Sequence, residues 1–173
     1  MRPTDFFLPA FNFQITLMRS TNQEAGASLL QPPSTAFSGN ALGDGAFQEC
    51  TGLEVTMDVQ EYLEGGRNDG VIKQVGRAKY SSIVLKRGMF YSEEGALNQE
   101  LWQWFQDVVS GVRPVPRYDG IVEVMDAKRE VRARWRLFRG LPEKISGPQL
   151  NARTGEIAIE ELTIAHEGLR LEV

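Results

Sequence analysis

The sequence contains few of the residues from which disulfides and metal centres are built. Of its 173 residues one is a cysteine, Cys50, and one is a histidine, His166. A single cysteine excludes an intramolecular disulfide, and the pair is too few to form a zinc cluster. We therefore predict no metal site and no cofactor, and we interpret His166 as a surface or internally hydrogen-bonded residue.

Long apolar runs are missing as well. No run approaches the roughly 18 residues that a transmembrane helix needs, so we predict no membrane span. Residues 1–10 contain one basic residue and a broken apolar segment, which is a poor signal peptide. We expect synthesis in the cytoplasm without Sec export, and one domain over residues 1–173. The net charge of −4 favours no nucleic-acid partner.

Combinations of catalytic residues are also absent from the sequence. No Ser or Cys motif surrounds His166. The glycines near position 40 lack the spacing and the lysine of a phosphate loop. Adjacent acids at 93–94 and 160–161 suit a helix start and a strand better than a catalytic pair. We therefore predict a protein that is not an enzyme.

A long β-hairpin is predicted over residues 49–87. Leu53, Val55, Met57 and Val59 alternate with polar residues, which is the period of a strand. Glycine, asparagine and aspartate at 65–70 favour a reversal, and the chain returns as a second strand towards Leu85. Because an exposed hairpin edge tends to recruit another chain, we infer self-assembly.

Upstream of the hairpin, apolar and polar residues alternate over 11–17 and predict a first strand. Residues 1–10, with two prolines, are expected to form an extended N-terminal arm. Residues 20–46 form a long loop without a sustained period, which is either a partner-binding loop or a floppy insertion. Its scattered apolar residues slightly favour ordering on contact with a partner.

One helix is expected after the hairpin. Ser92 is its predicted N-cap, apolar residues follow at helical spacing, and Gly111 is placed to end it. An aromatic group on this helix suits either a stacking platform or packing against a sheet. Packing is the favoured interpretation because aromatic residues at helical spacing with apolar neighbours are usually buried. This group consists of Trp102, Trp104 and Phe105.

A second hairpin, 121–126 with 131–138, and a last strand, 156–165, complete the predicted elements. Pro142 is expected to break the chain between them. A change of apolar phase near Glu160 and Glu161 suggests a bulge, or a strand that moves from one packing environment to another. The arginines of the second hairpin suit a phosphate site less well than a solvent-facing or inter-subunit face. Charged surfaces on neighbouring subunits are one interpretation and solvated faces the other. The candidate inter-subunit charges are Arg132, Arg134, Arg136, Glu160 and Glu161.

Several short motifs in a fixed order carry a resemblance to a known family. They are Phe11-Asn12-Phe13, Thr51-Gly52-Leu53, residues 61–68, Leu85-Lys86-Arg87-Gly88, residues 101–105, residues 147–152, residues 159–162 and residues 166–169. Together they span residues 10–170, and in this order the chain resembles the tail tube proteins of contractile phages and contractile injection systems.

The resemblance implies a fold and a function. The implied fold is mainly β with one flanking α-helix, a β-sandwich or barrel with an extended hairpin. Six copies would form a ring whose hairpins line a lumen, and stacked rings would make a tube that carries cargo in a phage tail or phage-tail-like particle. The implied partners are a sheath, a baseplate hub or spike, and a cap or terminator protein. The hairpin residues expected at the lumen or subunit interface are Leu53, Val55, Met57, Tyr62, Glu64, Gly65, Gly66, Asn68 and Lys79.

Alternatives remain open beside the main tube subunit. The 20–46 loop is longer than expected for a plain tube subunit, which also suits a tube initiator or terminal ring at the baseplate or cap. A monomeric ligand-binding β-barrel is a more distant alternative, and it predicts an enclosed pocket and a stable monomer.

Overall fold

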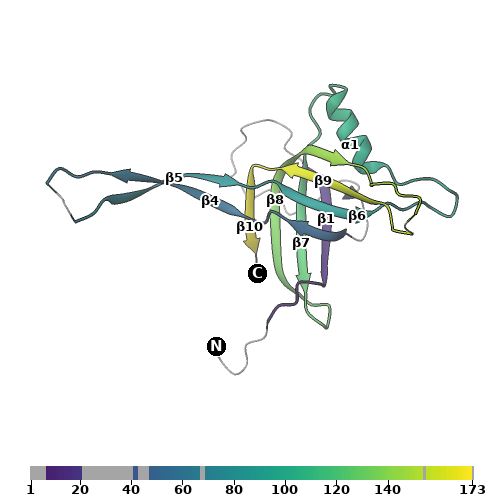
Figure 1. Cartoon of the computed structure of the whole chain (residues 1–173), viewed down its shortest axis with the longest axis horizontal. Helices are drawn as coiled ribbons and strands as arrows, with labels where there is room; N and C mark the ends of the chain where they lie inside the picture. Colours follow the sequence, from purple (N-terminus) through teal and green to yellow (C-terminus); the bar gives the residue numbers. More distant parts are fainter. Residues whose placement is uncertain (1–6, 21–40, 43–46, 67–68, 154, 173) are drawn as a thin grey trace.

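The computed structural model describes residues 7–20, 41, 42, 47–66, 69–153 and 155–172. Two β-sheets that share one long strand, a separate hairpin and one helix make up this part of the chain (Figure 1). In chain order the elements are β1 (Phe13–Arg19), β2 (Ala41–Leu42), β3 (Phe47–Thr51), β4 (Val55–Tyr62), β5 (Ile72–Tyr80), β6 (Ile83–Gly88), α1 (Glu100–Val109), β7 (Tyr118–Met125), β8 (Val131–Ser146), β9 (Ile159–Ala165) and β10 (Gly168–Glu172).

The first sheet has the order β2-β1-β7-β8-β10, and the second has the order β8-β9-β6-β3. All pairs are antiparallel, and the strands of one sheet cross those of the other (Figure 1). Within the described residues β2 and β3 do not pair with each other, so the sheets are not closed into a barrel. The prediction of a mainly β fold with one helix is confirmed. Of the two predicted forms, a sandwich or a barrel, the structure has the sandwich.

Strand β8 turns the corner between the two sheets. At the bend Arg139 has a φ of 55°, and a Cβ on Gly140 would lie 2.8 Å from the Ile164 side chain. Pro142 is buried within β8, next to a shift of register against β9. The predicted chain break at Pro142 is therefore wrong, because a proline beside a bulge can remain in a strand.

The core lies between the sheets and under α1. Leu17, Ile83 and Ile164 are fully buried there. From α1, the ring of Trp104 packs 4.6 Å from that of Tyr118, and its Nε1 donates a hydrogen bond to the carbonyl of Pro116 at 2.9 Å. Packing of the helix aromatics is thus confirmed for Trp104, whose indole is buried with its one donor satisfied.

Helix α1 begins later than predicted. Ser92 belongs to a turn in which its hydroxyl accepts the backbone N–H of Ala96, and the N-cap position is Gln99. The Ser92 prediction is wrong because this turn uses the hydroxyl before the helix starts. Gly111, with a φ of 84°, follows the helix and donates its N–H to Val108, so the predicted C-terminal end is confirmed.

The terminal segments differ from expectation in part. Strand β9 begins at Ile159, three residues later than the predicted strand over 156–165, and β10 has no counterpart among the predicted elements. The His166 ring nitrogens Nδ1 and Nε2 lie 2.9 and 3.0 Å from the carbonyl oxygens of Gly168 and Ser81, so the neutral ring donates its one N–H to one of them, and burial lowers the pKa of His166. Residues 1–6, 21–40 and 43–46 lie outside the described residues, so the roles expected of the arm and the long loop stay predictions.

Candidate assembly surfaces

The β4–β5 hairpin projects from the body as a two-stranded sheet of its own (Figure 1). The predicted single hairpin over 49–87 is divided: β3 and β6 remain in the second sheet, while β4 and β5 continue outward. All eight residues of β4 are exposed. An isolated two-stranded ribbon is at best marginally stable in water, so a covering contact would stabilise this hairpin.

One face of the hairpin is apolar. Val55 lies opposite Tyr80, Met57 opposite Ala78, and Val59 opposite Val75, and directly opposed residues share a face. Apart from Ala78, these side chains are large and have exposed fractions between 36% and 77%. We call Val55, Met57, Val59 and Val75 the hairpin apolar face. A contiguous exposed patch of this kind marks a site of interaction.

The base of the hairpin is a tight crossing of two chain segments. Gly52 has a φ of 88°, and a Cβ there would lie 2.1 Å from the carbonyl oxygen of Ser82. Glu54 accepts the backbone N–H of Ser81 at 3.3 Å. Only glycine suits this conformation and spacing, so Gly52 determines where the hairpin leaves the second sheet.

A bulge interrupts the ribbon between Met57 and Val59. A Cβ on Gly76 would lie 2.7 Å from the carbonyl oxygen of Asp58, which explains a glycine at this point. Lys79 forms an ion pair with the Asp58 carboxylate at 2.9 Å across the polar face. Lys79 therefore has a partner within its own hairpin, and its expected inter-subunit role stays a prediction.

Two glycines at the tip of the hairpin have open space around them. A Cβ on Gly65 or Gly66 would meet nothing within 4 Å, and Gly66 has a φ of 88°. Tyr62 and Leu63 beside them are exposed, whereas Asn68 lies outside the described residues. These positions, with Leu53 and Glu64, remain predicted interface residues.

The arginines of β8 have partners within the chain. Arg132 pairs with Asp126 and Glu130, Arg134 with Glu123 at 2.6 Å, and Arg136 with Glu172 at 3.5 Å. The Glu130 backbone N–H and the Arg132 guanidinium lower the pKa of Asp126. Likewise, Glu161 lies 3.6 Å from Lys144. Most of these pairs are partly exposed, so an additional contact across an interface remains a prediction for them.

Glu160 differs from this group and corrects the sequence interpretation. Its side chain and that of Arg87 are each 1% exposed, and Arg87 Nε donates to Glu160 Oε1 at 2.5 Å. Trp102 Nε1 donates to the other carboxylate oxygen at 2.9 Å, and Arg87 Nη2 donates to Asn98 at 3.0 Å. A carboxylate enclosed in this way is not on the surface, so Glu160 is not an inter-subunit charge.

The change of apolar phase in the last strand is the sequence feature that indicates a buried Glu160. Leu162 and Ile164 are buried, Glu160 lies in the same phase, and Ile157 and Ile159 lie on the exposed side. A charged residue in the buried phase of a strand requires a partner in the core. The predicted bulge at Glu160 is wrong, because β9 pairs with β6 in continuous register from Ile159 to Ile164.

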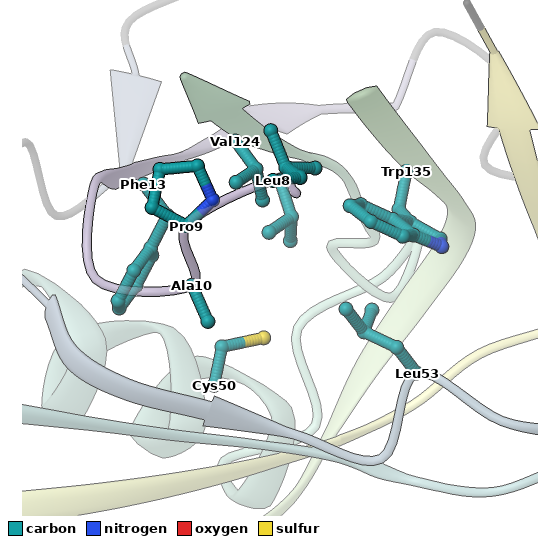
Figure 2. Close-up of a pocket in the computed structure, with 9 residues that line it drawn as sticks. Leu8, Pro9, Ala10, Phe13, Cys50, Leu53, Val124 and Trp135 are labelled. Carbon is teal, nitrogen blue, oxygen red and sulfur yellow. The ribbon is translucent and has the colours of Figure 1, made fainter. Parts of the chain in front are cut away.

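An apolar pocket of about 340 Å³ lies between the sheets, near the base of the hairpin (Figure 2). Its walls come from the N-terminal segment, β1, β3, β7 and β8, and its lining residues are Leu8, Pro9, Ala10, Phe13, Cys50, Leu53, Val122, Val124 and Trp135. Burial raises the pKa of the Cys50 thiol to about 11. The pocket therefore offers apolar contact and a neutral thiol, and its lining includes no acid or base for catalysis.

Within the described part of the chain, no group of three or more His, Cys, Asp or Glu side chains is placed to bind a metal ion. The same residues include no helix long and apolar enough to cross a membrane. The described residues form a sandwich with an outward hairpin, and they leave the apolar face of that hairpin exposed. These features define the class of a structural assembly subunit.

The chain belongs to the T4-like virus tail tube protein family, whose gp19 family model matches residues 9–170. It is therefore a structural tail tube protein, a component of a phage tail or tail-like particle, and not an enzyme. The predicted family resemblance is confirmed. No curated protein matched the sequence in a separate search.

Solved structures with the same fold come from contractile injection systems. A chain in the cryo-EM structure of the anti-feeding prophage baseplate, six-fold symmetrised, matches with a TM-score of 0.73 and 19% identity, covering 98% of this chain and 97% of that one. A chain of the extended PVC sheath-tube complex matches at 0.71 and 18%, covering 98% and 93%. A chain of the anti-feeding prophage tube-terminating cap matches at 0.69 and 18%, covering 99% and 95%.

Proposed function

We propose that this protein is the repeating inner-tube subunit of a contractile injection system or phage tail, and that it assembles into stacked hexameric rings around a cargo-conducting lumen. The uncovered hairpin apolar face supports this proposal most directly. A subunit that exposes Val55, Met57 and Val59 on an isolated ribbon gains stability when a neighbour covers them.

Ring geometry follows from a contact between unlike surfaces. A hairpin that leaves its own body meets a different surface on the next copy, so the contact is heterologous and closes into a ring when the rotation permits. Similarity to chains from a six-fold symmetrised baseplate and from a sheath-tube complex supports six copies per ring, with a sheath and a baseplate as partners. In this arrangement the protein supplies rigidity and a passage for cargo.

A second candidate is a tube initiator or a terminal ring. The similarity extends to chains of a baseplate and of a tube-terminating cap, with coverage as complete as that for the sheath-tube complex. The two roles share a fold and differ in whether the subunit adds to copies of itself. A ligand-binding barrel is disfavoured, because the strands of the described residues are not closed around a lumen.

Electron microscopy with mass measurement of the purified protein tests these roles. Six-fold rings or long tubes formed by the protein alone are expected for the repeating subunit. Rings that extend only from an added baseplate assembly favour the initiator role. A monomer that persists at high concentration, with and without baseplate and sheath proteins, contradicts both.

A further inference from the structure

His166 connects the base of the hairpin to the body of the protein. It lies in the turn between β9 and β10, whereas Tyr80 and Ser81 lie at the end of β5, where the hairpin returns to the second sheet. The His166 Nε2 atom is 3.0 Å from the carbonyl oxygen of Ser81, and the ring centres of His166 and Tyr80 are 5.6 Å apart. The contact joins residues that are 85 positions apart along the chain, so it ties the hairpin to a distant turn.

The β9–β10 turn holds the His166 ring in a fixed place. The backbone N–H of Glu167 donates to the carbonyl of Phe138 at 3.0 Å. The Glu167 carboxylate accepts hydrogen bonds from Arg117 and Arg139, each at 2.8 Å. These contacts attach the turn to the first sheet, so the imidazole next to Glu167 is presented to the hairpin base from a rigid support.

Two carbonyl oxygens face the two ring nitrogens of His166. Besides Ser81 at Nε2, the carbonyl of Gly168 lies 2.9 Å from Nδ1. A neutral imidazole has one N–H and an imidazolium has two, so protonation in place would give both carbonyls a donor. The ring is half-buried, however, and burial lowers the pKa of His166 by more than the two carbonyls raise it. The ring therefore fits this site better without its charge.

Charged side chains on the segments that hold the ring have partners of their own. Glu54 accepts the hydroxyl of Ser81 at 3.4 Å, and Lys79 pairs with Asp58 at 2.9 Å. Glu143 on β8 accepts a hydroxyl hydrogen bond at 2.5 Å from the residue after Ser81. The titratable and charged side chains on these segments are Glu54, Lys79, Tyr80, Arg139, Glu143 and Glu167. The causes of the lowered pKa of His166 are instead burial and the two carbonyls.

The lowered pKa gives the contact a direction of pH dependence. A ring that has left its site is exposed to water and binds a proton more readily than the half-buried ring. Acid therefore favours the open state of the hairpin base. The closed contact is fully present above 6.5, the ordinary pKa of histidine, and it weakens as the pH falls below that value.

We propose that the contact between His166 and Ser81 is a pH-sensitive attachment of the hairpin: the neutral ring holds the hairpin base against the β9–β10 turn, and protonation releases it. The attachment acts within one chain and is present before any assembly. Its effect on assembly rests on the proposed function, because a released hairpin leaves a smaller fraction of copies competent to join a tube.

NMR and hydrogen exchange test the attachment below the concentration at which the protein assembles. His166 is the one histidine of the sequence, so its ring resonance is unambiguous, and it is expected to titrate below 6.5. Amide protection at the hairpin base, residues 78–82, is corrected for the intrinsic pH dependence of exchange. This protection is expected to fall about two- to fivefold between pH 7 and pH 5.5. Protection at Leu85 and Leu162, in the β6–β9 pair, is expected to stay constant.

His166→Gln is the matched variant, because its amide still donates a hydrogen bond and does not titrate. Its hairpin-base protection is expected to be the same at both pH values. Asp119, whose pKa is raised by burial, is present in both proteins, so comparing them isolates His166. An equal fall in both proteins, or a wild-type ring that titrates at or above 6.5, would overturn the inference.

The wild type alone provides a second check if the variant does not fold. The ring resonance and the hairpin-base protection are expected to change over the same pH range, and protection that stays constant while the ring titrates would overturn the inference.

Microscopy separates this inference from the proposed function. Tubes formed by a protein whose hairpin-base protection is independent of pH would overturn the attachment and leave the tube role intact. A pH-sensitive hairpin in a chain that forms neither rings nor tubes, even with baseplate and sheath proteins added, would support the attachment and contradict the proposed function.

Discussion

Arg87 and Glu160 face each other across the β6–β9 pair, with Arg87 Nε 2.5 Å from Glu160 Oε1 and both side chains 1% exposed. Asn98, in the loop before α1, accepts a hydrogen bond from Arg87 Nη2, and Trp102, in α1, donates one to Glu160 Oε2, while Arg87 Nη1 is buried without a hydrogen-bond partner among the described residues. The ion pair therefore joins the second sheet to α1 and to the loop that precedes it.

Removing one partner of this pair leaves a charge buried without compensation. Glu160→Gln or Arg87→Met is expected to lower the free energy of unfolding by about 3–5 kcal/mol, measured by urea denaturation. The control is Arg134→Met, which breaks the partly exposed pair with Glu123 and is expected to cost less than about 1 kcal/mol. Equal losses in the free energy of unfolding for the buried and the exposed pair would contradict the expectation that the buried pair contributes more to stability.

Gly52 is expected to tolerate no side chain. Gly52→Ala places a Cβ against the carbonyl of Ser82 and forces alanine to a φ of 88°, so we expect a loss of at least about 2 kcal/mol in thermal or urea unfolding. Gly65→Ala, at a tip position with open space around its Cβ, is the matched control and is expected to change stability by less than about 0.5 kcal/mol.

A variant at the hairpin tip is expected to affect assembly without affecting folding. Gly65→Leu meets nothing within 4 Å in its own chain, so the monomer is expected to keep its unfolding free energy within about 0.5 kcal/mol. In an assembled tube the bulky side chain would meet a neighbour, and tube growth is expected to stop. Negative-stain microscopy measures the outcome against Ala127→Leu on the exposed β7–β8 turn. Normal tubes from Gly65→Leu would show that no neighbour approaches the tip closely.

Because the Cys50 thiol is buried, we expect the free energy of unfolding to fall in alkaline solution. Burial raises the pKa of its thiol from 9.0 to about 11, so between these values the folded chain retains a proton that the unfolded chain has lost. The free energy of unfolding then falls as pH rises, by about 1 kcal/mol at pH 10 relative to pH 8. Urea titrations of the wild type and of Cys50→Ala measure the difference, which isolates Cys50 from other groups. Parallel pH profiles of the two proteins would contradict a buried thiol.

Local pattern was sufficient for several elements. The alternation of Val55, Met57 and Val59 indicates a strand whether or not it packs on a core, and β4 follows it while remaining exposed. Gly111 ends α1 as expected, because a left-handed residue after a helix is a local requirement. Ser92 was misinterpreted because its hydroxyl serves equally well in a turn.

The sequence by itself determined the period of the strands, the end of the helix, and the lack of residues for disulfides and zinc, since these depend on composition and near neighbours. Only the tertiary structure decided that Glu160 is buried, because its partner Arg87 lies 73 residues away along the chain. It also decided that β8 passes through Pro142 into a second sheet and that the hairpin leaves the body at Gly52 and Ser82. Those outcomes depend on which distant segments pair, and a carboxylate or a proline is tolerated in a strand only when such pairing supplies its partner or its bulge.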